Sequence, residues 1–187
     1  MTRDTTRREA LAEAATDYVL DHGLIGLSLR PLADELGTSD RMLLYHFDSN
    51  DDLVATVLRV SNDRSVAQIR ALRPAPDDRH AVVALWEALQ TRQLSRCQRT
   101  YVEAAALGLF RREPYVRVVR QANVVWSQAV ADYLVASGAD RARAPRAVEL
   151  LDATMTGFLL DLPLDPRDPA QEVAVNDLAD AVASIVG

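Results

Sequence analysis

The chain has 187 residues, a formal net charge of −6, 49% hydrophobic and 26% charged residues, and it is long enough to bury a core of its own. The acidic total argues against a general affinity for nucleic acids. No apolar run approaches the roughly 18 residues of a membrane span, no secretory signal is visible, and the single cysteine, Cys97, excludes an internal disulfide, so we expect a cytoplasmic protein.

The chain is expected to be all-α, because no period-2 run of β-branched residues and no Asn-Gly or Asp-Gly hairpin turn is present. Hydrophobic spacing at i, i+3, i+4 and i+7 predicts three short helices and then six longer ones. We place the nine helices at about 6–22, 28–36, 40–47, 49–72, 78–93, 95–110, 114–137, 145–162 and 169–186. The segment "LPLDPRDP" after residue 161 predicts a loop.

Capping residues mark the ends of the first helices. Gly23 follows the first helix, where a C-terminal cap belongs. Ser28 and Ser39 precede the second and third helices as N-caps. Ser49 and Asp52 form an S-x-x-D capping signature at the start of the fourth.

The stretch "LGTSDRMLLYHF", residues 36–47, predicts the turn and second helix of a helix-turn-helix. Leu43 and Phe47 would point inward, and the opposite side would enter the major groove. Donors and thymine contacts would then come from Thr38, Ser39, Arg41, Met42, Leu44 and Tyr45, with Arg30 placed for a phosphate. The alternative is an ordinary αα-hairpin in a helical protein, which shows the same hydrophobic spacing.

The run "AATDYVLDHGLIGLSLRPLADELGTSDRMLLYHFDSNDDLVATVL", residues 14–58, resembles the DNA-binding domain of TetR-type transcriptional regulators. The resemblance implies a helix-turn-helix domain over residues 1–50 and a ligand-binding and dimerisation domain over 51–187. It also implies a homodimer on a palindromic operator in double-stranded DNA, and a repressor released by an unidentified small molecule. It carries DNA contact over to Arg30, Thr38, Ser39, Asp40, Arg41, Met42, Leu44, Tyr45, His46 and Asn50.

Three positions depart from the family's pattern. Leu44 stands where the family usually has Tyr, and Asn50 stands where a Lys usually meets a phosphate. Asp40 is an acid in the first turn of the recognition helix, where it favours the helix dipole but repels phosphate. These departures imply weak affinity or a demanding operator.

Residues 1–47 hold five Arg and eight acidic residues, a formal −3. We expect the acids to lie on the first helix and the back of the second, and Arg3, Arg7 and Arg8 to form an arm that reaches DNA. Such asymmetry would allow specific binding with a moderate salt dependence.

Six of the ten aromatic residues fall between Trp86 and Tyr133, among polar residues. An apolar site with a few polar groups is how a small-molecule pocket is built between helices. We therefore predict effector contacts at Trp86, Gln90, Tyr101, Glu103, Asn123 and Trp126. The alternative is that these residues form an ordinary bundle core.

The last two predicted helices carry broad apolar stripes. A two-fold dimer is what a recognition helix needs to read two half-sites one turn apart. We predict a dimer interface at Val148, Leu151, Met155, Phe158, Leu178 and Val182. The alternative is packing within one chain.

Two other classes of function stay open. An all-α enzyme would use Cys97 or a pair of acids, but no base, metal-ligand spacing or phosphate loop accompanies them, so we expect no enzyme activity and no cofactor. A ligand-sensing or partner-binding helical dimer that has lost DNA binding would fit the departures at Asp40, Leu44 and Asn50.

Overall fold

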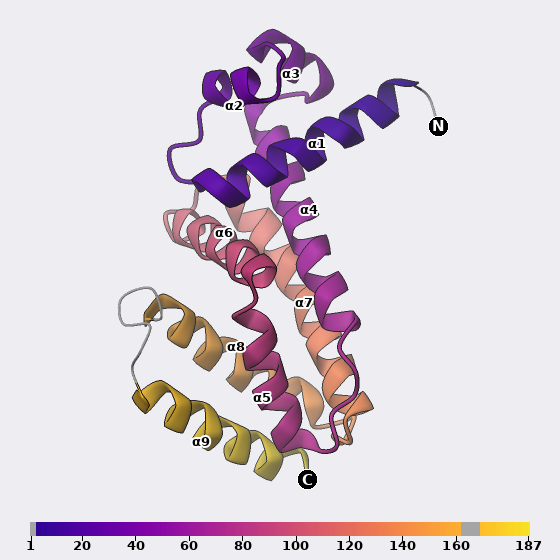
Figure 1. Cartoon of the computed structure of the whole chain (residues 1–187), viewed down its shortest axis with the longest axis vertical. Helices are drawn as coiled ribbons and strands as arrows, with labels where there is room; N and C mark the ends of the chain where they lie inside the picture. The colour runs from indigo at the N-terminus through magenta and orange to yellow at the C-terminus, as the bar shows by residue number, and fades with distance from the viewer. Residues whose placement is uncertain (1–2, 162–168) are drawn as a thin grey trace. The chain divides into compact units, whose positions relative to one another are not determined.

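The computed structural model describes residues 3–161 and 169–187, and over these residues it contains nine α-helices and no strand (Figure 1). The helices are α1 (Arg3–His22), α2 (Leu29–Glu35), α3 (Asp40–His46), α4 (Asn50–Arg70), α5 (Asp78–Leu89), α6 (Arg92–Leu109), α7 (Tyr115–Ala136), α8 (Ala144–Asp161) and α9 (Pro169–Val186). Every end agrees with the sequence prediction to within about one turn. The predicted loop at 162–168 lies outside the described residues. None of the described helices combines the length and apolar character needed to cross a membrane.

The chain divides into two compact units, which are described separately. Unit 1 comprises residues 1–65 and 95–123, and unit 2 comprises residues 66–94 and 124–187. The division falls within α4, α6 and α7, so each of these helices contributes to both units. The predicted functional boundary at residue 50 remains a prediction.

Unit 1 holds α1, α2 and α3 around an apolar core. Figure 1 shows α2 and α3 next to each other, beside the start of α4. The side chains of Val19, Leu32, Leu43 and Phe47 are completely buried. Burying each of these contributes about 1.5–3 kcal/mol relative to exposure. α2 and α3, with seven residues each, are therefore held by packing and not by their own propensity.

The predicted caps are confirmed at two of three helix starts. The Ser39 hydroxyl accepts from the backbone N–H of Met42 at 3.2 Å, and the Ser49 hydroxyl accepts from that of Asp52 at 3.1 Å. Ser28 occupies the N-cap position of α2 in an extended conformation but makes no side-chain capping bond, which corrects the prediction there. Gly23 ends α1 with φ +91°, a conformation that favours glycine.

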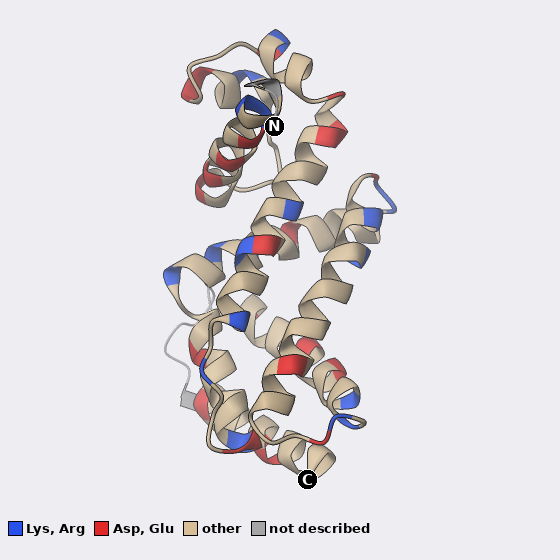
Figure 2. Ribbon diagram, turned by 90° about the vertical axis from the view of Figure 1, so that its right-hand side faces the viewer, with Lys and Arg blue, Asp and Glu red and all other residues tan. Residues whose placement is uncertain are grey.

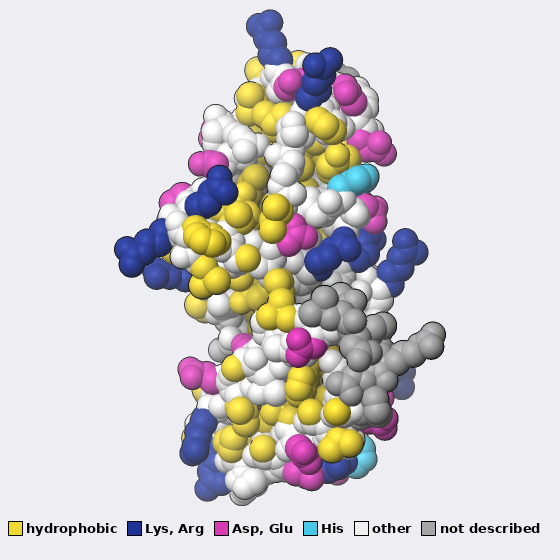
Figure 3. All heavy atoms as spheres, turned by 90° about the vertical axis from the view of Figure 1, so that its left-hand side faces the viewer, with side chains coloured by type: hydrophobic (Ala, Val, Ile, Leu, Met, Phe, Trp, Pro, Cys, Tyr) yellow, Lys and Arg dark blue, Asp and Glu magenta, His cyan; other side chains and the backbone are white. Residues whose placement is uncertain are grey.

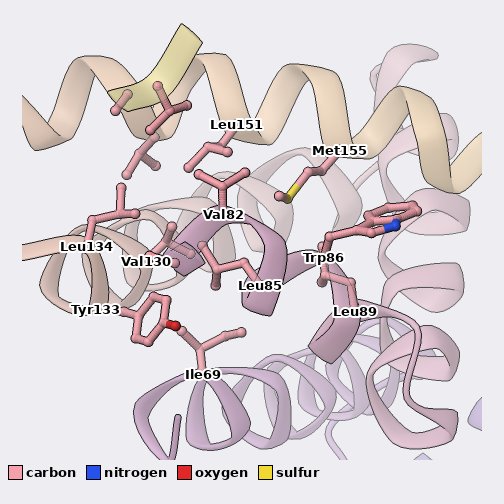
Figure 4. Close-up of a cluster of buried hydrophobic side chains, with 14 of the residues drawn as sticks. Ile69, Val82, Leu85, Trp86, Leu89, Val130, Tyr133, Leu134, Leu151 and Met155 are labelled. Carbon is pink, nitrogen blue, oxygen red and sulfur yellow. The ribbon is translucent and has the colours of Figure 1, made fainter. Parts of the chain in front are cut away.

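Unit 2 has its own core, in which α9 packs against α5 and α8. Figure 4 shows side chains from α4, α5, α7 and α8 converging there, among them Leu85, Leu134 and Leu151, which are at most 2% exposed. Trp86 meets Phe158 edge to face, with ring centroids 5.6 Å apart and planes at 76°. The aromatic residues of this unit are therefore part of its packing.

Candidate nucleic-acid interface

The connection between α2 and α3 has the geometry of a helix-turn-helix. Leu36 caps α2, and Gly37 follows with φ +62°. The Thr38 N–H then donates to the carbonyl of Ala33 at 2.9 Å, which closes the turn. Ser39 directly follows as the N-cap of α3, and its side-chain hydrogen bond fixes the direction of this helix relative to the turn.

Burial on one side of α3 decides which side faces out. Leu43 and Phe47 are fully buried, while Tyr45 is 70% exposed. Of the ten residues predicted to contact DNA, eight are exposed: Arg30, Ser39, Asp40, Arg41, Met42, Leu44, Tyr45 and Asn50. Thr38 is half-buried. α3 therefore presents a continuous outward surface.

His46, which the resemblance also placed in contact with DNA, does not lie on the outward surface of α3. Its side chain is only 9% exposed, and its ring lies edge-on to that of Tyr45 at 5.2 Å. The reason is position: His46 is the last residue of α3, next to the buried Phe47, and the helix turns its side chain inward. Tyr45 is left as the exposed aromatic residue of α3.

Arg8 also departs from the expected DNA-contacting arm, because residues 3–8 form the first turns of α1. The Arg8 guanidinium donates to the carbonyl of His46 and to the carboxylate of Asp52, each at 2.9 Å. It also lies over the Phe47 ring, 5.0 Å from the centroid. Arg8 thus ties α1 to α3 and α4, whereas Arg7 is exposed.

The acidic residues of α1 are largely paired within unit 1. Figure 2 shows acidic residues following one another along this helix. Arg64 on α4 donates to Asp17 at 2.6 Å and to Glu13 at 2.5 Å, and Arg96 on α6 pairs with Asp21. These carboxylates therefore have cationic partners of their own. Their charge acts less on the outward surface of α3 than the total for residues 1–47 suggests.

Three polar residues of α6 hold the end of α1 and the turn that follows it, which the sequence did not indicate. Arg96 Nε and Arg99 donate to the carbonyl of Leu20 at 3.3 and 2.5 Å. The Glu103 carboxylate accepts from the backbone N–H groups of Leu24 and Ile25 at 2.6 and 2.7 Å. We name residues 96, 99 and 103 the α6 clamp. Their spacing of three and four was the signal available in the sequence, because it puts them on one side of a helix.

The six predicted effector residues belong to both units. Trp86, Gln90 and Trp126 lie in unit 2, whereas Tyr101, Glu103 and Asn123 lie in unit 1. Glu103 is engaged in the α6 clamp, and Asn123 is exposed. Cys97, the candidate nucleophile, is 2% exposed and packs in the interior.

Trp126 forms a hydrogen bond with the carboxylate of Asp152, a residue that the sequence did not indicate. Its indole Nε1–H donates to Asp152 at 3.0 Å, and the Ser127 hydroxyl donates to the other carboxylate oxygen at 3.3 Å. Burial raises the pKa of Asp152, the two hydrogen bonds lower it in part, and the charge of Glu149 adds to the rise. Among the described residues, no Arg or His side chain forms a salt bridge with Asp152.

The residues predicted for a dimer interface lie largely inside unit 2. Five are at most 6% exposed within one chain: Val148, Leu151, Met155, Leu178 and Val182. Phe158 is partly buried and packs on Trp86. Packing within the chain therefore accounts for these stripes. The large apolar side chains that stay exposed on the same two helices are Leu160 (52%) and Val173 (61%).

No protein-family profile and no curated protein sequence matches the chain. Several solved structures, however, match the chain over most of its length. A protein described as a TetR-family transcriptional regulator from Rhodococcus sp. aligns with a TM-score of 0.72 and 21% identity, over 98% of this chain and 100% of that one. The multidrug binding protein EbrR, complexed with imidazole, aligns at 0.68 with 27% identity, over 98% and 94%. EbrR is also among the matches in complexes with proflavin and with ethidium.

A protein described as a transcriptional regulator from Saccharomonospora viridis, in complex with choline, aligns with a TM-score of 0.65 and 20% identity, over 96% of this chain and 95% of that one. These likenesses extend over both units and are not limited to the helix-turn-helix. They confirm the resemblance stated from residues 14–58 and the all-α fold predicted from the pattern of the whole chain.

Proposed function

We propose that this chain, which has the fold of the TetR-family transcriptional regulators, is a DNA-binding transcriptional regulator that acts as a repressor in the cytoplasm. A small molecule would release it from a palindromic operator. The observation that carries the proposal is the outward surface of α3, held by the buried Leu43 and Phe47 and started by the Ser39 cap.

Exposed side chains of α2 and α3 suit a DNA duplex. Arg30 and Arg41 are exposed and supply charged donors for phosphates and base edges. The exposed Tyr45 adds a hydroxyl for hydrogen bonds to the sugar–phosphate backbone of DNA. Pairing of the α1 acids with Arg64 and Arg96 supports the proposal, because it reduces the charge that opposes an approaching phosphate.

A palindromic operator requires two copies of α3 related by a two-fold axis. We propose that α8 and α9 form the interface between two copies through their exposed sides. Leu160 and Val173 are the exposed apolar side chains there, and Ala153 and Gly157 are small exposed residues on α8 that would let helices approach closely. The six residues that the sequence predicted for the dimer interface would pack beneath this surface, within each chain.

The effector would be a small molecule that binds among the aromatic residues. EbrR in its complexes with ethidium and proflavin, and the Saccharomonospora viridis regulator in its complex with choline, are structural neighbours that bind organic cations. Asp152, a half-buried carboxylate beside Trp126, supports a cationic effector for this chain.

The release mechanism would be a population shift between two positions of the recognition helices. The α6 clamp supports α6 as the coupling element, since it binds the end of α1 through Arg96 and Arg99 and the α1–α2 turn through Glu103. A ligand that displaced α6 would act directly on the turn that positions α2.

The test is fluorescence anisotropy with DNA from just upstream of the chain's own gene, at several salt concentrations. An Arg41→Ala, Tyr45→Ala double variant provides the comparison. We expect tight, saturable binding to one palindromic segment, lost in the variant. Weak binding that is equal for both proteins and disappears at physiological salt would instead favour a ligand-sensing dimer without operator binding, which the exposed carboxylate of Asp40 also fits.

A further inference from the structure

The outward surface of α3 exposes large apolar side chains beside the polar Asp40 and Arg41. Met42 is 40% exposed, Leu44 is 43% exposed and Tyr45 is 70% exposed, all within a helix of seven residues. Single exposed hydrophobic residues are common on protein surfaces, but three on one short helix mark a contact surface. Near the top of Figure 3, where α2 and α3 lie, hydrophobic side chains are at the surface among charged ones.

Few polar groups are available on this helix to read bases. The Ser39 hydroxyl already accepts from the Met42 N–H, and His46 is buried. The Asp40 carboxylate accepts hydrogen bonds but cannot donate them. Arg41 is thus the charged donor on the outward side of α3. The neutral donors that remain on this side are the hydroxyls of Ser39 and Tyr45, so apolar contacts are a large share of what α3 offers to bases.

The major groove offers one apolar group that identifies a base, the C5-methyl of thymine. We propose that Met42 and Leu44 read thymines by contact with this methyl group, so that the operator carries thymines opposite both side chains. The proposal rests on the DNA-binding function proposed above. Arg41, exposed on this helix, and Arg30, exposed on α2, favour DNA over an apolar protein partner as the occupant of this surface, because both carry positive charge.

The size of the effect follows from the area of one methyl group. Removing a buried methylene-sized group weakens an apolar contact by an amount equivalent to about three- to fivefold in affinity. Apolar contact is screened far less by salt than contact with phosphate. The ratio of affinities with and without the methyl should therefore stay constant while the absolute affinity falls with salt.

The experiment uses the full chain and begins by selecting duplexes from a random library. Each thymine of a selected duplex is then replaced singly by deoxyuridine, which removes only the methyl. Anisotropy titrations compare the wild type with Met42→Ala and Leu44→Ala. Leu109→Ala, which truncates an exposed leucine on α6, is the matched control. We expect a loss of about three- to fivefold at particular thymines in the wild type and control, each absent in one of the two α3 variants.

The outcomes separate the two proposals. If no duplex is selected, DNA binding itself fails and this inference fails with it. If duplexes are selected but deoxyuridine changes nothing, the thymine inference is overturned while the regulator remains. If the loss is equal in the wild type and both α3 variants, the thymines act through DNA shape, which also overturns it. Circular dichroism checks that both variants fold, and each variant tests one contact independently.

Discussion

The carboxylate of Glu103, on α6, accepts a hydrogen bond of 2.6 Å from the backbone N–H of Leu24, and its same oxygen accepts another of 2.7 Å from Ile25. Glu103→Ala would leave two backbone donors without their partner, so we expect the free energy of unfolding to fall by about 1–3 kcal/mol. Glu103→Gln keeps an acceptor oxygen and should lose less. Urea denaturation measures both, and an unchanged midpoint for Glu103→Ala would contradict the role assigned to the α6 clamp.

Adjacent residues of α3 should behave in opposite ways. Leu43 is fully buried and Leu44 is 43% exposed. Leu43→Ala should reduce the free energy of unfolding by about 2–5 kcal/mol, because it leaves a cavity in the core of unit 1. Leu44→Ala should change it by less than about 0.5 kcal/mol. Equal effects in thermal and chemical unfolding would mean that α3 is rotated from the orientation described.

Substitutions of Arg7 and Arg8 should have different effects, one on DNA binding and the other on stability. Arg8 bonds to the carbonyl of His46 and to Asp52, so Arg8→Ala should destabilise the protein by about 1 kcal/mol, a modest value because the ion pair is partly exposed. Arg7 is exposed, so Arg7→Ala should leave stability unchanged and reduce the salt dependence of operator binding. The reverse pattern would restore Arg8 to the DNA-contacting arm.

Asp152 should make stability depend on pH. Because burial raises its pKa in the folded chain, the folded state binds this proton more tightly than the unfolded state. The resulting stabilisation is complete below the unfolded pKa and is lost as pH rises through the folded one. Asp152→Asn removes the buried charge and can still accept from Trp126 Nε1. We expect it to unfold at a higher temperature than the wild type at neutral pH.

That difference should shrink on acidification and vanish below about pH 4, where the carboxyl is neutral in both states. Differential scanning calorimetry over this range gives the comparison. Ser127→Ala is the control, since it removes one donor and leaves the charge. A difference that grows toward low pH would show that the folded protein prefers the ionised carboxylate.

A substitution of Leu160 tests whether the dimer interface lies on α8 and α9. Leu160 is 52% exposed on α8, and Leu109 is 83% exposed on α6. Leu160→Arg places a charge on the proposed interface and should shift the dimer to monomer in sedimentation experiments, whereas Leu109→Arg should not. Dissociation by Leu109→Arg alone would move the interface away from α8 and α9.

The sequence predicted the helices well because hydrophobic periodicity reports which side of a helix is buried. It predicted correctly that Leu43 and Phe47 face inward and that Ser39 caps α3. Periodicity cannot report which neighbour buries a residue. Val182 therefore suggested a partner copy from its stripe, although the packing of its own chain already buries it completely.

Polar residues were harder to place for a related reason. Glu103 was expected beside an effector and instead binds the α1–α2 turn, and Arg8 was expected beside DNA and instead bonds to His46 and Asp52. The partners of Glu103 are 79 and 78 residues away in the chain, and those of Arg8 are 38 and 44 residues away. No local pattern encodes such distances. Asp152 was missed because nothing in its own sequence neighbourhood separates a half-buried acid from a solvated one.

Because unit 1 includes parts of α6 and α7, its helix-turn-helix cannot simply be transferred alone into a hybrid regulator. Ala104 on α6 and Val118 on α7 complete the same buried cluster as Leu43 and Phe47, and the α6 clamp holds the turn before α2. A graft that joined residues 1–50 to the body of another regulator would lose all of these supports at once. A transplant that is meant to keep its operator preference should therefore carry the matching surface of α6 and the first turns of α7 along with the helix-turn-helix.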